Sequence, residues 1–142
     1  MRKSGEAPAL SAAVAYLDTS AFLKLVIAEE QSPALQAFLL RWPQRASADL
    51  LRTEAVRALR RAGYGDRVGA ARRLFSSLRL IRLDAPLLDL AGDLNPRGLR
   101  SLDALHLAAA LTIGDDLGVV VTYDARLAEA ARERGLVSDS PS

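Results

Sequence analysis

The chain has 142 residues, half of them hydrophobic and a quarter charged. This length and composition are typical of one globular domain with a substantial core, and they argue against an intrinsically disordered chain. Cysteine is absent, which excludes disulfide bonds, catalysis by a thiol and zinc sites built from thiolates.

The net charge is +2, but the charged residues are unevenly distributed. The segment from Arg41 to Arg82 holds eleven arginines and three acidic residues, and the rest of the chain holds eight basic and fourteen acidic residues. A basic segment beside an acidic remainder is typical of proteins that handle nucleic acids. Because arginines outnumber lysines seventeen to two, codon bias and solvated helix faces explain the pattern equally well, and charge alone does not decide.

Residues 1–12 are expected to form a disordered leader. The positively charged start suggests a signal peptide, but Glu6 and Pro8 interrupt the apolar stretch that such a peptide needs. We therefore predict a single domain over residues 13–138, followed by a polar tail at 139–142. No apolar run approaches the roughly 20 residues that span a bilayer, so a cytoplasmic protein without membrane contact is expected.

Short apolar runs alternate with helical patterns along the rest of the chain. Strands are predicted at 13–17, around 45–46, at 78–83, at 117–123 and at 136–137. Helices are predicted at 20–29, 33–41, 48–62, 66–77, 86–94, 101–114 and 125–134. Three serines are predicted to be N-caps of helices: Ser32, Ser47 and Ser101. This alternation indicates an α/β protein with a mostly parallel sheet covered by helices on both faces, a three-layer α/β/α sandwich.

Two acidic residues come directly after the most strongly apolar predicted strands. Asp18 follows the run that ends at Leu17, and Asp124 follows the strand that contains Val119-Val120-Val121. Either aspartate, taken alone, is explained as the cap of the next helix. The repeated placement, however, puts both carboxylates at the carboxyl edge of a parallel sheet, where ligands bind in open α/β folds.

Two further acidic residues lie on predicted helices. Asp103 is in the first turn of a helix that is apolar nearly all round, so its carboxylate must reach either water or a cation. Glu54 borders the apolar stripe of its helix and, taken singly, is explained as a surface pair with Arg57. The sequence therefore predicts a functional site only if the fold brings these side chains to Asp18.

Other polar residues near these positions are weaker candidates. His106, the single histidine, is more simply explained as a core histidine with a local hydrogen bond than as a ligand or a base. Asp115 and Asp116 lie in a glycine-flanked turn and are interpreted as solvated, with a contribution to the site left open. The hydroxyl residues that could hydrogen-bond ligands or a phosphate are Thr19, Ser20 and Thr122.

Four motifs, read together, resemble those of a known family. They are Tyr-Leu-Asp-Thr-Ser-Ala-Phe at 16–22, Ser-Ala-Asp-Leu-Leu-Arg-Thr-Glu-Ala-Val at 47–56, Leu-Arg-Ser-Leu-Asp-Ala-Leu-His-Leu-Ala at 99–108 and Val-Thr-Tyr-Asp-Ala-Arg-Leu-Ala at 121–128. In this order they resemble PIN-domain proteins, and more closely the VapC toxin ribonucleases of bacterial toxin–antitoxin pairs. The resemblance covers about residues 16–135, nearly the whole chain.

The resemblance implies a compact α/β/α sandwich and a Mg²⁺- or Mn²⁺-dependent endoribonuclease that cleaves RNA. The family's catalytic and metal-binding acids map onto Asp18, Glu54, Asp103 and Asp124. Asp18 and Asp103 are expected to be the firmest ligands, with the other two binding a second metal or orienting its water. An all-oxygen ligand set without a Cys or His cluster also favours Mg²⁺ or Mn²⁺ over zinc. The family further implies a cognate antitoxin that blocks the pocket, a homodimer, and DNA contact only through the antitoxin.

Two other functions remain open on the same fold. One is a non-catalytic module that binds RNA or protein. The other is a phosphatase with Asp18 as nucleophile, which the sequence disfavours because Ser20 stands where such enzymes often place a second acid.

Overall fold

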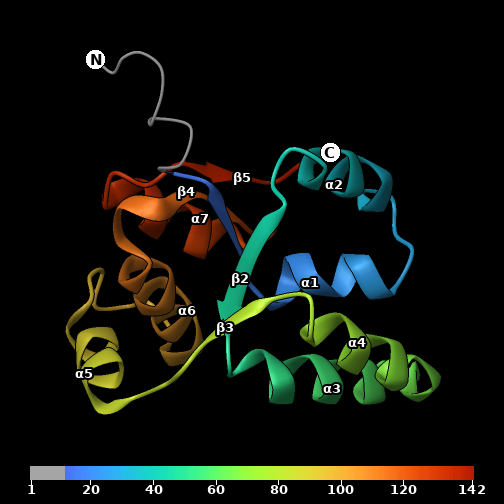
Figure 1. Ribbon diagram of the computed structural model, residues 1–142. Helices are drawn as coiled ribbons and strands as arrows, with labels where there is room; N and C mark the ends of the chain where they lie inside the picture. The colour runs from blue at the N-terminus through green and yellow to red at the C-terminus, as the bar shows by residue number, and fades with distance from the viewer. Residues whose placement is uncertain (1–11) are drawn as a thin grey trace.

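The computed structural model describes residues 12–142, so the expected leader lies outside the described residues apart from Ala12. The centre of the fold is a sheet of five parallel strands in the order β3-β2-β1-β4-β5 (Figure 1). The strands are β1 (Val14–Leu17), β2 (Gln44–Ala48), β3 (Arg79–Ile81), β4 (Leu117–Val121) and β5 (Ser138–Asp139). The chain starts at the central strand, adds two strands on one side, and then crosses to the other side.

Helices cover both faces of this sheet. The α-helices are α1 (Thr19–Val26), α2 (Ser32–Leu39), α3 (Leu51–Arg61), α4 (Val68–Phe75), α5 (Ala85–Asp93), α6 (Ser101–Thr112) and α7 (Ala125–Glu133). Within residues 12–142 there are also two short 3₁₀ helices, η2 (Gly65–Arg67) and η3 (Gly114–Asp116). The three-layer α/β/α sandwich expected from the alternating pattern is confirmed.

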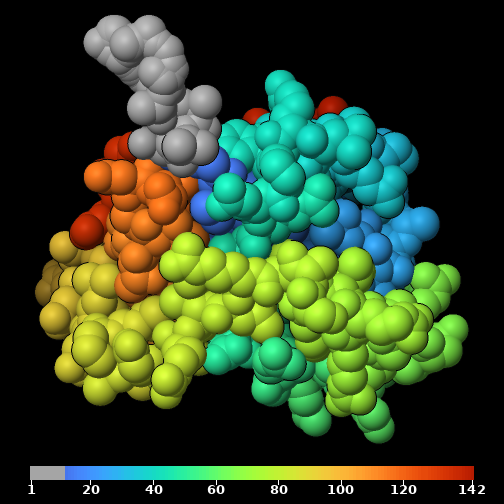
Figure 2. Space-filling view, in the orientation of Figure 1, coloured from blue at the N-terminus to red at the C-terminus, as the bar shows by residue number. Residues whose placement is uncertain are grey.

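The two faces of β1 show how the layers form. Side chains of successive strand residues point to opposite faces, and here Val14 and Tyr16 pack with α5, α6 and α7, whereas Ala15 and Leu17 pack with α1 and α2. The pair α3 and α4 packs against α1 in a cluster of its own. In the space-filling view the α3–α4 lobe and the α5 lobe stand apart along the lower margin of the molecule (Figure 2).

The three serines predicted as N-caps do not cap their helices. Ser32 is the first residue of α2, and its hydroxyl accepts from Glu29 N–H and donates to the Lys24 carbonyl, so it closes the loop after α1 instead. Ser47 is fully buried inside β2. Ser101 is the first residue of α6, which has no side-chain cap. The local sequence pattern does not show which groups of the folded protein will surround or hydrogen-bond to a serine hydroxyl.

The C-terminal residues pack against the end of β4. The last strand is at 138–139 rather than 136–137, because Leu136 N–H still bonds to the Ala131 carbonyl and completes the end of α7. In the expected tail, the Ser140 hydroxyl donates to the Thr122 carbonyl at 2.5 Å. The Pro141 carbonyl accepts from the Tyr123 hydroxyl at 2.6 Å. Among the described residues, the helices are too short or too polar to cross a membrane.

Candidate active site

The carboxyl ends of β1 and β4 meet at the point where the strand order reverses. Leu17 pairs with Val121 in the parallel ladder, and Asp18 N–H extends this ladder by bonding to the Val121 carbonyl at 3.3 Å. The next residues of the two strands, Asp18 and Thr122, are therefore neighbours. Such a switch point is the usual ligand-binding position in open α/β sheets.

Asp18 caps α1 and is almost completely buried. Its Oδ1 accepts from the Ser20 hydroxyl at 2.7 Å and from Ala21 N–H at 3.0 Å, and its Oδ2 accepts from the Thr122 hydroxyl at 2.6 Å. Burial raises the pKa of Asp18, while the charge of His106 and these three hydrogen bonds oppose the rise. The carboxylate is thus held rigidly in an environment that disfavours its negative charge.

The two hydroxyls that hold Asp18 are themselves fixed by the β4–α7 turn. Tyr123 N–H donates to the Ser20 hydroxyl at 2.9 Å, and Asp124 N–H donates to the Thr122 hydroxyl at 3.0 Å. Each hydroxyl accepts one backbone hydrogen bond and uses its own proton to reach Asp18. The supporting residues predicted from sequence, Ser20 and Thr122, therefore orient the carboxylate.

Glu54 lies on α3, and its side chain contacts residues of α1 and α6. Its Oε1 accepts from the Thr19 hydroxyl at 2.5 Å and lies 2.8 Å from His106 Nε2. Burial by itself raises the pKa of Glu54, but hydrogen bonds from His106 and Thr19 and the charge of His106 outweigh it, so the pKa is lowered. Glu54 is therefore not the surface partner of Arg57 that its helix position suggests.

His106 connects Glu54 to the core. Its side chain is 3% exposed, and Nδ1 lies 2.7 Å from the hydroxyl of Tyr16, which is fully buried in β1. Burial, together with the charges of Asp18 and Glu54, raises the pKa of Tyr16 well above its ordinary value and keeps the phenol protonated. The chain Tyr16–His106–Glu54 runs from the middle of the sheet to the cleft.

Asp103 and Asp124 complete the acidic set. Asp124 caps α7, where its Oδ1 accepts from Arg126 N–H and Leu127 N–H. Asp103, half-buried in the first turn of α6, accepts no hydrogen bond from residues 12–142. Burial raises the pKa of Asp103, as do the negative charges of Asp124, Asp18 and Glu54. Asp103 therefore lies close enough to the other three carboxylates to be repelled by them.

All four predicted acids line one open cleft of about 680 Å³. The cleft is lined by Asp18, Thr19, Ser20, Glu54, Arg100, Ser101, Leu102, Asp103, His106, Asp124, Ala125 and Arg126. Asp18, Asp103 and Asp124 have no cationic partner within 4.0 Å among residues 12–142. In this described part of the chain, no three carboxylate or imidazole side chains lie close enough together to enclose a metal ion. Metal binding by the set therefore stays a prediction.

The chemistry of these side chains fits a hard divalent cation. The donors are carboxylate oxygens, which Mg²⁺ and Mn²⁺ prefer. Asp103 has no described hydrogen-bond partner, and both burial and the neighbouring negative charges, which a cation would neutralise, raise its pKa. Asp124 has one oxygen, Oδ2, that takes no hydrogen bond from the described residues. A cation bound in the cleft could therefore be coordinated by oxygens of Asp103 and by Asp124 Oδ2, which take no hydrogen bond from the described residues.

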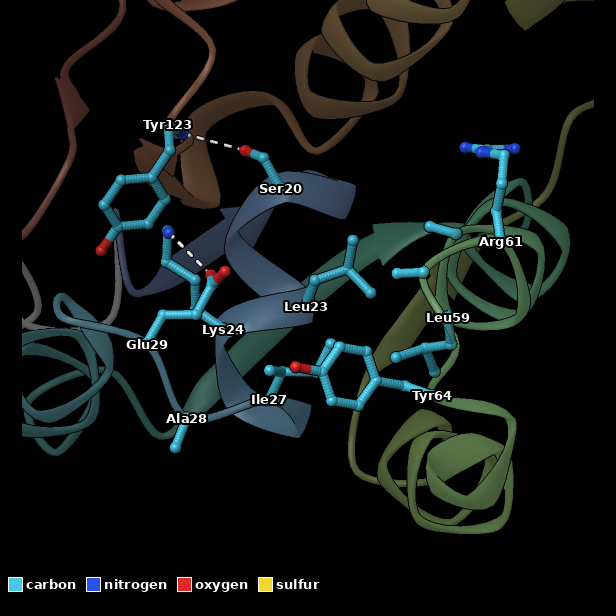
Figure 3. Close-up of a pocket in the computed structure, with 12 residues that line it drawn as sticks. Ser20, Leu23, Lys24, Ile27, Ala28, Glu29, Leu59, Arg61, Tyr64 and Tyr123 are labelled. Carbon is cyan, nitrogen blue, oxygen red and sulfur yellow. Dashed lines mark hydrogen bonds and ion pairs between the residues drawn. The ribbon is translucent and has the colours of Figure 1, made fainter.

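A second cavity of about 620 Å³ adjoins the cleft at Ser20 (Figure 3). Its floor is apolar, with Leu23 and Ile27 of α1 facing Leu59 and Tyr64 across the groove. It holds none of the four acids. The four predicted acids therefore belong to the carboxylate cleft and not to this second cavity.

Three residues of the cleft network are missing from the sequence prediction. Arg100 and Arg126 line the cleft without a partner in an ion pair among residues 12–142, and Tyr16 supports His106 from below. The arginines have a usable signal, since each lies within three residues of a predicted acid at a helix N-terminus. Tyr16 has none, because it resembles any strand residue. Asp115 and Asp116, in η3, are exposed and do not line the cleft.

Comparison with known proteins places the chain in a family. Residues 15–133 match the PIN domain. The chain is 45% identical to Ribonuclease VapC46 of Mycobacterium tuberculosis over 130 residues, covering 92% of this chain and 99% of the relative. It is 40% identical to Ribonuclease VapC47 of the same species, covering 89% and 96%.

A solved structure agrees in fold. The crystal structure of Mycobacterium tuberculosis VapC20, described as a sarcin-ricin loop cleaving toxin, superposes with a TM-score of 0.70 at 19% identity and covers 89% of this chain and 99% of that one. With the fold, the order of the four motifs and these relatives in agreement, the chain belongs to the PIN-domain family and to its VapC group.

Proposed function

We propose that this chain is a Mg²⁺- or Mn²⁺-dependent endoribonuclease and the toxin of a toxin–antitoxin pair. One observation carries the proposal. Three carboxylates without a described cationic partner, those of Asp18, Asp103 and Asp124, line the same cleft as Glu54, at the switch point of the sheet. Nearby like charges are unfavourable unless a proton or a cation neutralises them. The names of the curated relatives as ribonucleases supply the reaction class.

Asp18 and Asp103 would hold the metal most firmly, with Asp124 and Glu54 completing the set. When bound, the cation supplies charge neutralisation at the phosphate and lowers the pKa of a coordinated water. Asp18 suits this role because the hydroxyls of Ser20 and Thr122 fix its orientation. Preorganised ligands do not have to be reordered when the site is loaded.

Glu54 would act as the proton acceptor of the reaction. Its Oε1 takes two hydrogen bonds, from Thr19 and His106, whereas Oε2 takes none from residues 12–142. The lowered pKa of Glu54 keeps it ionised at neutral pH. Oε2 can then accept a proton from a water whose oxygen bonds to phosphorus, while the P–O bond to the leaving ribose oxygen breaks and that oxygen takes up a proton from solvent; this is a general-base role for a positioned carboxylate.

The cations of the cleft would bind the RNA backbone. Arg100 and Arg126 line the same cleft as the acids, at the N-termini of α6 and α7. Their guanidinium groups suit phosphate oxygens, which they bind in a bidentate manner. Such contacts fix the position of the RNA and do not read its sequence.

Two partners belong to the proposal through the VapC group. One is a cognate antitoxin that inhibits the toxin, and the other is a second copy of the chain. Co-expression with the protein encoded by a small neighbouring reading frame tests the first, because a genuine antitoxin suppresses Asp18-dependent growth arrest. Sedimentation of the purified chain tests the second.

The decisive experiment is RNA cleavage by the purified chain with and without Mn²⁺. We expect cleavage that EDTA abolishes and added Mn²⁺ restores. Asp18→Asn protein should bind RNA but not cut it, and Asp115→Asn, at an exposed acid outside the cleft, should cut normally. RNA binding with no cleavage by the wild-type chain would favour the non-catalytic module. Equal cleavage by Asp18→Asn would refute the assigned site.

A further inference from the structure

We infer that His106 is a positioning residue for Glu54: its Nε2–H holds the Glu54 carboxylate in the cleft, and the Tyr16 hydroxyl fixes the imidazole ring from behind. This inference rests on the proposed ribonuclease function, because holding Glu54 in one orientation affects activity only if Glu54 takes part in RNA cleavage. The sequence alone favours an ordinary core histidine; His106 is indeed buried, and its contact with Glu54 supports the further role inferred here.

The geometry joins three elements. Tyr16 lies in β1, His106 in α6 and Glu54 in α3, and the two linking distances are 2.7 Å and 2.8 Å. The Tyr16 and His106 rings meet edge to face at 71°, with their centroids 5.8 Å apart. Solvent exposure rises along this series of hydrogen-bonded side chains, from the fully buried Tyr16 through 3% for the His106 side chain to 19% for that of Glu54. These contacts therefore connect Glu54, at the cleft, with two buried side chains of the core.

The donors and acceptors permit one direction for the contact with Glu54. An ionised carboxylate only accepts hydrogen bonds, so His106 Nε2 must carry the proton in that pair. In the neutral ring Nδ1 is then an acceptor, and the Tyr16 hydroxyl is the group that donates to it. In the charged ring both nitrogens donate. The Nε2–H to Glu54 bond is the same in either form, so the role does not depend on ring charge.

A purely structural role explains these contacts less well. The neighbours of His106 on α6 are Leu107, Ala108, Ala109 and Ala110, all buried, and an apolar side chain would pack there without desolvating an imidazole. A polar pair buried in such surroundings is stabilised only if all its members find partners. Here the outermost partner is a residue of the proposed catalytic set, which needs one defined orientation.

The wild-type protein allows a test that needs no substitution. Because the chain has one histidine, ¹⁵N-labelled histidine gives a single imidazole spin system in the NMR spectrum. We expect a protonated, slowly exchanging Nε2 in the metal-free protein, and a shift of the Nδ1 signal in Tyr16→Phe. An unprotonated Nε2, the other neutral tautomer, would overturn the inference.

Substitutions separate positioning from packing. Glutamine places its amide nitrogen near the Nε2 position and asparagine near Nδ1, so His106→Gln can reach Glu54 and His106→Asn cannot. Loss of a supporting hydrogen bond typically lowers activity about 10–100-fold, and we expect a kcat loss of that size in His106→Asn and His106→Leu with KM for RNA unchanged. His106→Gln should recover to within about fivefold of wild type. The control, Thr112→Val, removes a hydroxyl that donates to the Ala109 carbonyl at the other end of α6, outside the cleft.

The outcomes distinguish this inference from the proposed function. If wild-type cleavage does not depend on Asp18, the proposed function fails and the kinetic comparison is void, while the NMR test still decides the Nε2–H contact. If cleavage depends on Asp18 but folded His106→Asn, checked by circular dichroism, cuts at the wild-type rate, the positioning role is wrong. Equal losses in His106→Gln and His106→Asn would also refute it, because packing alone would then explain the effect.

Discussion

The Thr122 hydroxyl donates to Asp18 Oδ2 at 2.6 Å, although the two residues are 104 positions apart in the sequence. Parallel pairing of β1 with β4 makes them neighbours, and the Asp124 N–H that bonds to the same hydroxyl fixes its direction. Thr122 thus connects Asp18 to the β4–α7 turn, which carries Asp124. Orientation of Asp18 is therefore a property of the sheet and of this turn together.

Thr122→Val should impair catalysis with little change in shape. Valine fills the same volume but removes the donor to Asp18 and leaves Asp124 N–H without its acceptor, which costs about 1–3 kcal/mol of unfolding free energy. We expect RNA cleavage to fall about 10-fold or more, with an unchanged circular dichroism spectrum. The same substitution at Thr112, outside the cleft, is the control. A fully active Thr122→Val protein would show that the hydroxyl does not orient Asp18.

The parts of the fold that the sequence predicts well are those governed by local pattern. The β-branched run Val119–Val121 and the apolar stretch before Asp18 indicate buried strands, and both acids then fall at the carboxyl edge of the sheet by the geometry of parallel pairing. The alternation of elements fixes the layers. These features need no knowledge of distant contacts.

The parts that the sequence does not predict depend on contacts between distant segments. Considered alone, α3 predicts an ion pair between Glu54 and Arg57, yet the partner of Glu54 is His106, 52 residues away. Ser32 is a residue type that often caps helices, but its hydroxyl bridges the Lys24 carbonyl of α1 and Glu29 N–H in the loop that follows α1. A polar side chain near an apolar stripe has several possible partners, and only the assembled fold selects one.

Asp103→Asn should stabilise the metal-free protein while abolishing cleavage. Burial and neighbouring negative charges raise the pKa of Asp103, so the folded state holds this proton more tightly than the unfolded chain. Ionisation therefore destabilises the fold as the pH rises above the ordinary pKa of about 4. At pH 7 we expect a higher melting temperature for Asp103→Asn than for wild type, and a difference that shrinks towards pH 4.

The matched control for Asp103→Asn is Asp115→Asn, which changes an exposed acid outside the cleft and should leave both melting temperature and cleavage unchanged. If Asp103→Asn instead lowered the melting temperature at pH 7, Asp103 would have a stabilising partner in the metal-free state.

Glu54→Gln should show the opposite dependence on pH. The pKa of Glu54 is lowered in the folded state, so its ionised form contributes stability above the ordinary pKa of about 4.3, and this contribution is lost as the pH falls through the folded-state pKa. Glutamine keeps the acceptor oxygen but loses the charge that strengthens both hydrogen bonds. We expect a loss of about 1–2 kcal/mol at pH 7, measured by urea unfolding, and a smaller loss at pH 4. A deficit independent of pH would contradict this account.

Mn²⁺ should raise the melting temperature of the wild-type chain. A ligand that binds only the folded state stabilises it by about 2.7 kcal/mol at a concentration 100 times its Kd. Differential scanning fluorimetry should show a rise that saturates with Mn²⁺ and is reversed by EDTA. The rise should be much smaller in Asp18→Asn and in Asp103→Asn. Equal shifts in wild type and in both variants would place any bound Mn²⁺ outside the cleft.

Gly118→Ala should destabilise the fold although it lies away from the acids. The pairing of β1 with β4 shifts register here, from Val14 opposite Leu117 to Ala15 opposite Val119, which leaves Gly118 as the extra residue of a bulge. A Cβ at this position would overlap the Ala12 carbonyl and the Trp42 ring. Because backbone and a partly buried ring must both move, we expect a loss of about 1–3 kcal/mol in urea unfolding. In Gly92→Ala, where a Cβ meets nothing within 4 Å in α5, stability should instead rise by up to about 1 kcal/mol. If the two variants unfolded alike, the close approach at Gly118 would not be a feature of the protein in solution.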